Sequence, residues 1–445
     1  MILLVDILTG YKGRVLKLLE EAKMEIGDNI RIIRGVEVFE GTLMPRYELA
    51  DDEHIVVKLR SGYNIGIGIT PTLKVEKTGI GSKPAFIAPS LPEEKHGLPD
   101  VSIISTGGTI ASRIDYRTGA VRSALSASDL YSVVPELSEI ANVKAKILFS
   151  LFSENIHAPH WTEMARNIAE DIGEGVDGVV ICHGTDTMAY TSAALSFALQ
   201  NPPVPVILVG SQRSSDRPSS DAAINLINGV TAAANGPIAE VMIGMHGSVS
   251  DTFTVLHRGT KVRKCHTSRR DAFKSVNISP LARVEAGKIS LLTEDYALRD
   301  SGRKLVLRPD FDEKVALVKF YSGFDPSIID WYVANNYLGL VLEGTGLGHV
   351  GSSLFSHIRN AVEHGLLIGM TSQCIWGRVN MNVYDTGMDL QELDVVPLGD
   401  MLPETALVKM MWVFGQTKNR DEVKKLLLTN IAGEFSSRSV YLEDE

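Results

Sequence analysis

Cysteine is scarce in this chain, with 3 residues among 445, and Cys182, Cys265 and Cys374 lie far apart. A disulfide scaffold or a zinc cluster would need more cysteines at closer spacing. Long apolar runs are missing too, because no stretch reaches the roughly 18 residues that a membrane helix requires. The first residues, MILLVDILTGYKGR, place an Asp inside a short apolar run with no basic region before it, unlike a signal peptide. We therefore expect a soluble cytoplasmic protein.

Basic residues are in the minority, with 44 Lys and Arg against 54 Asp and Glu, which gives a formal net charge of −10. This charge argues against a protein that binds nucleic-acid phosphates or an anionic membrane over a broad surface. Hydrophobic residues make up 44% of the chain and charged residues 22%, as in ordinary folded proteins. The length predicts two or three domains with real cores.

The pattern of apolar residues changes along the chain. Residues 1–75 hold short β-branched runs such as GDNIRIIRG and HIVVKLRSG, which predict a small SH3-like or Sm-like β-barrel. Residues 76–99 carry four prolines and no clear period, as a linker or arm would. From 100 to 297, continuous apolar strands alternate with helical stretches, which predicts a doubly wound α/β domain. The polar stretch 298–313 is then an interdomain linker, and 314–445 a smaller second α/β domain.

Two segments combine glycines with hydroxyl or acidic side chains directly after predicted strands. They are STGGT at 105–109 and HGTDT at 183–187. Ligands bind at the carboxyl ends of strands in open α/β sheets, and glycines let the backbone come close to a ligand. Turn glycines with helix-capping hydroxyls would explain either segment alone. Two such segments on strands expected to be neighbours favour a functional site.

TGGTIAS and HGTDTMAYT resemble the two signature segments of the bacterial-type L-asparaginase/glutaminase family. The resemblance extends through LVGSQRSSDRPSSDAAINL, VRKCHTSRRDAFKSVN and DMLPETALVKMM, and so covers about residues 100–430. It implies a two-domain asparaginase-like α/β fold behind the β-barrel. It also implies an activity, the hydrolysis of a side-chain amide.

The resemblance implies Thr109 as the nucleophile, with Thr185, Asp186 and Lys264 as a second catalytic cluster. The chemistry is reasonable, because a threonine hydroxyl is a weak nucleophile and needs a base beside it. A lysine held uncharged by its surroundings would take a proton through Thr185, with Asp186 orienting it. The backbone amides around Thr109 and Thr185 would stabilise the oxyanion. Alternatively, Lys264 belongs to a solvated basic cluster at 261–270.

Substrate-binding residues follow from the same resemblance. SENIHAPHW places Ser153 where a hydroxyl holds the substrate carboxylate, and Glu154 where an acid holds the ammonium group. The family usually has an amide and then an acid after this serine, and here the order is reversed, so Glu154 is alternatively only a loop acid. Gly108 and Gly184 are expected to contact substrate through their backbone. Tyr116 is the candidate for the tyrosine of the family's lid.

A glycine-rich segment at 346–351, GLGHVG, matches GxGxxG after a predicted strand. A dinucleotide site would also have an acid at the end of the next strand, about 20 residues on. LLIGMTSQ ends in Ser372 and Gln373 instead, which argues against nucleotide binding. In the asparaginase family the matching loop completes the active site of a neighbouring subunit.

Nearly 100 residues precede the asparaginase-like part, and this layout resembles the glutamyl-tRNA(Gln) amidotransferase family. There an asparaginase-like subunit releases ammonia from glutamine or asparagine. Its partner, the amidotransferase E subunit, uses ATP and Mg²⁺ to convert Glu-tRNA(Gln) to Gln-tRNA(Gln). The resemblance implies no cofactor or metal in this chain, a heterotetramer built on its homodimer, and tRNA contacts made mainly by the partner.

Two other functions remain as alternatives. One is a stand-alone cytosolic L-asparaginase with a regulatory β-barrel. The other is a non-catalytic scaffold whose barrel binds RNA. In the barrel, however, acids interleave the basic residues and aromatic side chains are few, which is unlike an RNA-binding surface. A complete Thr/Thr/Asp/Lys set also argues against a scaffold without activity.

Overall fold

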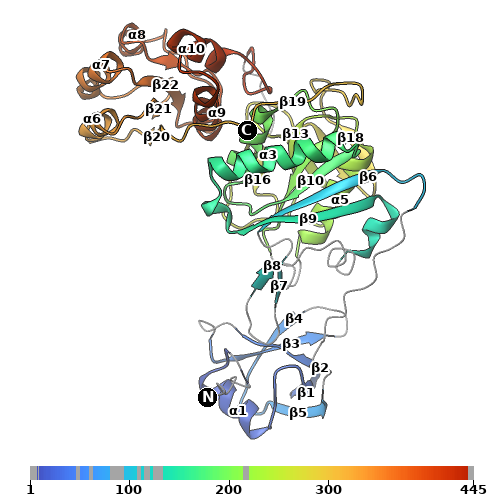
Figure 1. The fold of residues 1–445 in the computed structure, drawn as a ribbon. Coiled ribbons are helices and arrows are strands. Elements are labelled where there is room, and N and C mark those ends of the chain that lie inside the picture. The colour runs from blue at the N-terminus through green and yellow to red at the C-terminus, as the bar shows by residue number, and fades with distance from the viewer. Residues whose placement is uncertain are drawn as a thin grey trace, which may run out of the picture.

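The computed structural model describes residues 8, 10–46, 51–59, 64–80, 95–107, 112–114, 121–123, 134–213 and 220–438. We call residues 10–80 the N-terminal domain, 100–297 the central domain and 314–438 the C-terminal domain (Figure 1). Within the described ranges, no helix has both the length and the apolar character needed to cross a membrane.

In its described residues, the N-terminal domain is a five-stranded antiparallel sheet with one helix. Its elements are α1 (Gly13–Glu21), β1 (Asn29–Arg34), β2 (Glu37–Leu43), β3 (His54–Leu59), β4 (Asn64–Gly68) and β5 (Lys74–Gly79), and the strand order is β4-β3-β2-β1-β5. Ile30 and Ile32 of β1 alternate with exposed residues, and so place every second side chain in the core beside Leu19 of α1. The predicted small strand-rich domain is confirmed. Helix α1 was not predicted, and β5 continues past the expected boundary at residue 75.

An eight-stranded sheet forms the middle of the central domain, in the order β18-β17-β14-β13-β12-β10-β6-β9. Five strands are parallel: β6 (Asp100–Gly107), β9 (Asn142–Leu151), β10 (Gly178–Cys182), β12 (Val206–Val209) and β13 (Val241–His246). Three antiparallel strands continue the sheet: β14 (Thr254–Arg258), β17 (Ala282–Glu285) and β18 (Lys288–Leu291). The parallel strands β10 and β12 are buried on both faces, as their continuous apolar runs predict.

Helices cover both faces of this sheet. They are α3 (Ala158–Gly173), α4 (Met188–Ala198) and α5 (Ala222–Asn235). Alternate residues of β10 pack on opposite sides, because Val179 joins the core that holds α3 and α4, whereas Val180 joins the core that holds α5. This arrangement confirms the predicted doubly wound α/β class.

Small pairings complete the central domain. These are β7 (Ser112–Ile114) with β8 (Val121–Ser123), β15 (Val262–Lys264) with β16 (Phe273–Ser275), and β11 (Leu199–Gln200) with β19 (Val306–Leu307). Three short 3-10 helices are η2 (Pro135–Glu139), η3 (Ser153–Asn155) and, in the C-terminal domain, η4 (Ser352–Leu354). The expected linker at 298–313 contains β19, so this stretch is attached to the central domain by strand pairing.

The C-terminal domain is a four-stranded parallel sheet flanked by helices. Its strands, in sheet order, are β20 (Val315–Lys319), β21 (Gly339–Gly344), β22 (Leu367–Ser372) and β23 (Val396–Pro397). Its helices are α6 (Ser327–Ala334), α7 (Phe355–Glu363), α8 (Asp385–Glu392), α9 (Pro403–Gln416) and α10 (Arg420–Leu428). Helix α9 packs against α4 of the central domain, and the two domains share one apolar core.

Candidate active site

The two signature segments lie at the carboxyl ends of the neighbouring parallel strands β6 and β10. β6 pairs with β10 so that Ser105 lies opposite Cys182, and the Thr106 hydroxyl donates a 3.0 Å hydrogen bond to the Cys182 carbonyl. Gly107 has φ of +112°, and a Cβ there would lie 2.2 Å from the Leu151 carbonyl oxygen, so only glycine fits. β6 therefore ends at a left-handed glycine beside the end of β10, where α/β sheets place ligands.

Three of the predicted site residues follow β6 in the sequence. Gly108, Thr109 and Tyr116 are outside the residues that the structure describes. Their roles as substrate contact, nucleophile and lid tyrosine remain predictions. What the structure describes is the end of β6, two positions before Thr109 in the chain, and the groups that surround the end of β10.

A buried histidine shapes the turn after β10. Burial lowers the pKa of His183 to about 4, so the ring is neutral near pH 7. Its Nδ1 donates to the Gly184 carbonyl at 2.6 Å, and its Nε2 accepts from the Thr191 hydroxyl at 2.9 Å. Trp161 donates its indole N–H to the same hydroxyl oxygen at 3.2 Å. This chain of hydrogen bonds holds the turn that presents Thr185 and Asp186.

The structure brings Thr185, Asp186 and Lys264 together although Lys264 is far away in sequence. Lys264 Nζ lies 2.9 Å from Thr185 Oγ1 and 2.7 Å from Asp186 Oδ1. The lysine side chain is 13% exposed, whereas that of Asp186 is 71% exposed. The Lys264 amine and the Thr185 hydroxyl are therefore within hydrogen-bond distance, which is the geometry that a proton transfer between them would require.

Ser153 packs directly against the same turn. It is buried in η3, and a Cβ on Gly184 would lie 2.8 Å from the Ser153 Cβ. The Thr187 hydroxyl donates to the Ser153 carbonyl at 2.6 Å. Glu154 is exposed, and no ion pair or hydrogen bond joins its side chain to the rest of the described chain. The structure thus places Ser153 and Gly184 in contact with each other and leaves the carboxylate of Glu154 facing solvent.

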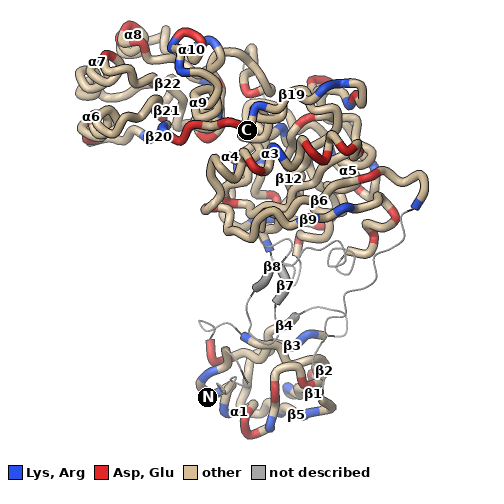
Figure 2. Tube along the Cα trace, viewed as in Figure 1, with Lys and Arg blue, Asp and Glu red and all other residues tan. Residues whose placement is uncertain are grey.

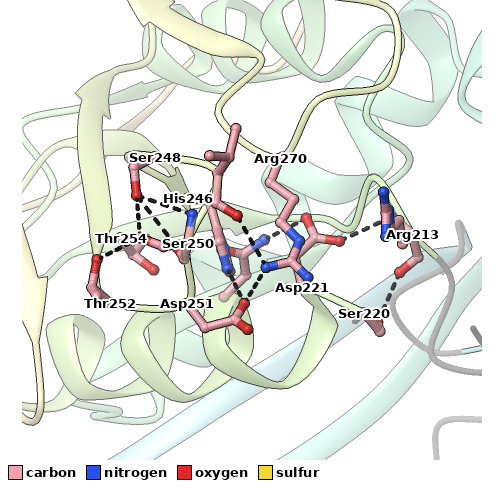
Figure 3. Close-up of polar contacts among 12 residues, drawn as sticks. Arg213, Ser220, Asp221, His246, Ser248, Ser250, Asp251, Thr252, Thr254 and Arg270 are labelled. Atoms are coloured by element: carbon pink, nitrogen blue, oxygen red, sulfur yellow. Dashed lines mark hydrogen bonds and ion pairs between the residues drawn. The ribbon is translucent and has the colours of Figure 1, made fainter. Parts of the chain in front are cut away.

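A polar network holds the loop of the β15–β16 hairpin (Figure 3). This loop begins directly after Lys264, the last residue of β15. Arg270 in that loop pairs with Asp251, and it also donates to the Val249 carbonyl at 3.3 Å. The buried His246, at the end of β13, lies with Nε2 3.2 Å from Asp251 Oδ1 and Nδ1 2.6 Å from Asn225 Oδ1. These contacts therefore attach the loop of the hairpin to the carboxyl end of strand β13.

Asp221 closes the other end of this network. Its carboxylate accepts backbone N–H bonds from Gln212 and Arg213 at 3.0 and 2.9 Å, and the Asn225 amide lies 3.2 Å from it. These contacts join the exit of β12 to helix α5. Neither Asp221 nor His246 stands out in the sequence, because their partners come from segments that only the folded chain brings together. Within the same described ranges, no group of three or more His, Cys, Asp or Glu is arranged to hold a metal ion.

Family models match most of the chain. "Asparaginase, N-terminal" matches residues 100–297, "Glutaminase/Asparaginase C-terminal domain" matches 314–427, and "GatD N-terminal domain" matches 24–78. The D subunit of the glutamyl-tRNA(Gln) amidotransferase of Metallosphaera sedula is 50% identical over 434 residues, which cover 97% of each chain. The chain belongs to the family of glutamyl-tRNA(Gln) amidotransferase D subunits. The D subunit of Pyrococcus abyssi is 52% identical over 95% of this chain and 98% of its own.

Solved asparaginases match a smaller part. The thermostable L-asparaginase from Thermococcus kodakarensis is 30% identical with a TM-score of 0.69, and covers 76% of this chain and 100% of its own. L-asparaginase I from Vibrio cholerae is 29% identical with a TM-score of 0.67, over 76% of this chain and 99% of its own. The asparaginase-like fold expected from the signature segments is thus confirmed. The D-subunit family shares more of the chain than these asparaginases do.

Proposed function

We propose that this chain is the ammonia-supplying amidohydrolase component of a tRNA-dependent amidotransferase. It would hydrolyse the side-chain amide of glutamine or asparagine, and the released ammonia would serve the conversion of Glu-tRNA(Gln) to Gln-tRNA(Gln). Membership of the D-subunit family over almost the whole chain supports the assembly. The observation that carries the chemistry is the contact of Lys264 with Thr185 and Asp186 beside the ends of β6 and β10.

In the proposed reaction the Thr109 hydroxyl attacks the amide carbonyl. Its proton passes through Thr185 to Lys264 and then to the leaving amide nitrogen, so that ammonia departs and an acyl ester on Thr109 remains. Water then hydrolyses the ester, which yields glutamate or aspartate and restores the threonine. Backbone N–H groups of Gly108 and Thr185 would stabilise the oxyanion in both steps.

Substrate recognition in this proposal relies on the turn that holds Ser153. Its hydroxyl would bind the α-carboxylate, with the Gly184 backbone beside it, because the two residues already touch. Glu154 would bind the α-ammonium from its exposed position, and Tyr116 would close over the site.

The proposed division of labour leaves phosphate chemistry to another protein of the assembly. This chain would need no cofactor or metal, and the amidotransferase E subunit, its partner, would bind ATP, Mg²⁺ and most of the tRNA. Two copies of each of the two proteins would form a cytoplasmic heterotetramer. The net charge of −10 supports this arrangement, since an acidic chain repels polyanions.

A stand-alone L-asparaginase is the second candidate. The solved asparaginases support it, since they cover 76% of this chain. The D-subunit relatives favour the first proposal, because they also match the N-terminal part that those asparaginases lack.

The deciding experiment separates the ammonia source from the ammonia user. We expect Thr109→Ala, Thr185→Val and Lys264→Met each to abolish transamidation driven by glutamine, with transamidation driven by ammonium chloride unchanged. Reconstitution would use the E subunit and charged tRNA, and liquid chromatography would measure Gln-tRNA(Gln). Loss of both reactions would assign these residues a structural role. Fast glutamine or asparagine hydrolysis by the chain alone, with no increase on adding the E subunit and charged tRNA, would favour the stand-alone enzyme.

A further inference from the structure

The strand that ends in Lys264 is bonded to the C-terminal domain on the side away from the candidate site. Lys261 Nζ lies 2.6 Å from Asp400 Oδ2 and 2.9 Å from the Asp400 carbonyl oxygen, with both side chains almost fully buried. Arg263 Nε lies 3.2 Å from Glu404 Oε1, and the Glu404 side chain is 6% exposed. Arg263 is adjacent to Lys264 in β15, so their side chains leave the strand on opposite faces.

Both ends of the β15–β16 hairpin have further bonds to the C-terminal domain. Before the hairpin, the Thr405 hydroxyl donates to the Thr260 carbonyl at 3.0 Å. After it, Asn277 and Gly377 exchange two hydrogen bonds of 2.8 and 2.9 Å. The hairpin belongs to the central domain in sequence, yet residues of the C-terminal domain hold its entry, its first strand and its exit.

Helix α9 also supports the other half of the Lys264 cluster. Helix α4 starts two residues after Asp186 and packs along α9, where Phe197 stacks on Trp412 with ring centroids 5.9 Å apart. Glu404 lies in the first turn of the same α9. A single helix, α9, therefore supports both halves of the cluster. It contacts α4, which follows Thr185 and Asp186, and it contacts Arg263, which precedes Lys264.

The Lys261–Asp400 and Arg263–Glu404 contacts are ion pairs, although apolar side chains could also hold the two domains together. A buried ion pair gains little net stability because desolvation offsets the attraction, but it constrains geometry more narrowly than apolar packing. Burial raises the pKa of the Glu404 carboxyl, Arg263 opposes that rise, and Glu343 adds to it. We expect this desolvation cost to be retained where the exact position of a strand, here β15, matters to the reaction.

We propose that Asp400 and Glu404 are positioning residues for Lys264, so that the C-terminal domain sets the lysine's contact with Thr185. This inference rests on the proposed amidohydrolase function. The two carboxylates touch no group of the candidate site themselves. They act through Lys261 and Arg263, which fix β15.

The test compares steady-state kinetics of amide hydrolysis by the full chain, reconstituted with the E subunit and charged tRNA. Glu404→Gln keeps the shape of the side chain and removes the charge that Arg263 meets. A displacement of a reacting group by about 1 Å costs roughly 100-fold in rate, so we expect kcat to fall about 10- to 100-fold, with KM within about 3-fold of wild type. Asp400→Asn should behave in the same way, and Glu404→Asp should recover part of the rate.

A double-mutant cycle covers the case in which a buried substitution prevents folding. Arg263 is 32% exposed and tolerates change more readily. Arg263→Gln should lower kcat like Glu404→Gln, and the double variant should be no slower than either single variant, because the pair acts as one unit.

Asp171→Asn is the matched control. Asp171 is a buried carboxylate 2.7 Å from Lys146 Nζ. It accepts from Ser102 near the amino end of β6, whereas Lys264 contacts the turn that follows the carboxyl end of β10. This variant should lose stability at unchanged kcat. An unchanged kcat in Glu404→Gln and Arg263→Gln would overturn the inference, and so would an equal loss in Asp171→Asn. A wild-type chain that hydrolyses neither amide under any of these conditions would instead overturn the proposed function, and the inference with it.

Discussion

Acidic and basic residues occur in the N-terminal domain and in the rest of the chain (Figure 2), but the two regions differ in how deeply their ion pairs are buried. Among the described residues of the N-terminal domain, each ion pair keeps at least one side chain about a third exposed or more, as in Arg14–Glu53, where the values are 70% and 60%. In the C-terminal domain the Lys409–Glu434 pair is 0% exposed on both sides, and Lys261–Asp400 joins the central and C-terminal domains with 0% and 3%.

This difference follows from what each region has to hold. The N-terminal domain closes an apolar core with alternating strands, and exposed ion pairs add little to its stability. The central and C-terminal domains must also hold segments such as the short β15–β16 hairpin and the end of the chain. Few backbone hydrogen bonds of the main sheets reach these segments. Buried charges with fixed partners locate such segments precisely, although their removal is costly.

The largest expected difference concerns two lysines with similar ion pairs. Lys264→Met should lower amide hydrolysis about 10²- to 10⁴-fold, the usual contribution of a general base. Lys77 pairs with Asp28 at 2.6 Å in the N-terminal domain. Lys77→Met should leave the hydrolysis rate unchanged but destabilise that domain, because the buried Asp28 carboxylate loses its counter-charge. Kinetic assays and thermal unfolding of both variants measure this contrast, and a large rate loss in Lys77→Met would break it.

The next effect concerns stability. Glu434 meets Lys409 at 2.5 Å and accepts the backbone N–H groups of Ile431 and Ala432. Glu434→Gln leaves the lysine buried without its counter-charge, so we expect a loss of roughly 3–5 kcal/mol in unfolding free energy. Denaturant unfolding followed by circular dichroism measures it. A loss below about 1 kcal/mol would mean that Lys409 is satisfied by its carbonyl partners alone.

Acid should destabilise the central domain through two buried histidines. Burial lowers the pKa of His183 to about 4 and that of His257 to about 3. Below pH 6.5 the unfolded chain binds protons that the folded chain does not, so stability is fully present above pH 6.5 and declines as pH falls toward 4. At about 1.4 kcal/mol per pKa unit, His183 alone accounts for about 3 kcal/mol.

Thermal unfolding between pH 7 and pH 4 tests this expectation. His183→Asn and His257→Asn should each flatten the decline, even where they lower the melting temperature at pH 7. His54 of the N-terminal domain is 45% exposed and pairs with the exposed Asp51, so His54→Asn serves as the control and should change the slope less than either buried histidine does. An identical slope in all three variants would contradict the assignment.

The smallest effect belongs to the exposed pair of the N-terminal domain. Glu53→Gln removes the partner of Arg14 at 3.0 Å, and because both side chains are well exposed we expect less than about 1 kcal/mol. Unfolding at low and at 1 M salt checks this, since salt should reduce the difference further. A salt-independent loss of several kcal/mol would show that the two regions do not differ as described.

Much of the candidate site could be predicted from local patterns. STGGT and HGTDT lie at the carboxyl ends of buried strands, and the structure places Thr185 and Asp186 in contact with Lys264. The catalytic roles expected from the motifs stay predictions. Helix α1 was missed because β-branched runs dominate its surroundings. The positioning roles proposed for Asp400 and Glu404 had no sequence signal beyond their place in the segment DMLPETALVKMM. A glutamate at a helix start resembles an ordinary first-turn acid.

The secondary structure along most of the chain could thus be predicted from the sequence alone. Apolar periodicity specifies strands and helices, and glycine next to a buried strand specifies the turn at Gly107, since these depend on neighbouring residues. Folding alone brought Lys264 to Thr185, 79 positions away, and Lys261 to Asp400, 139 positions away. Contacts between such distant residues depend on how layers pack, and no sequence window contains both partners of the bond.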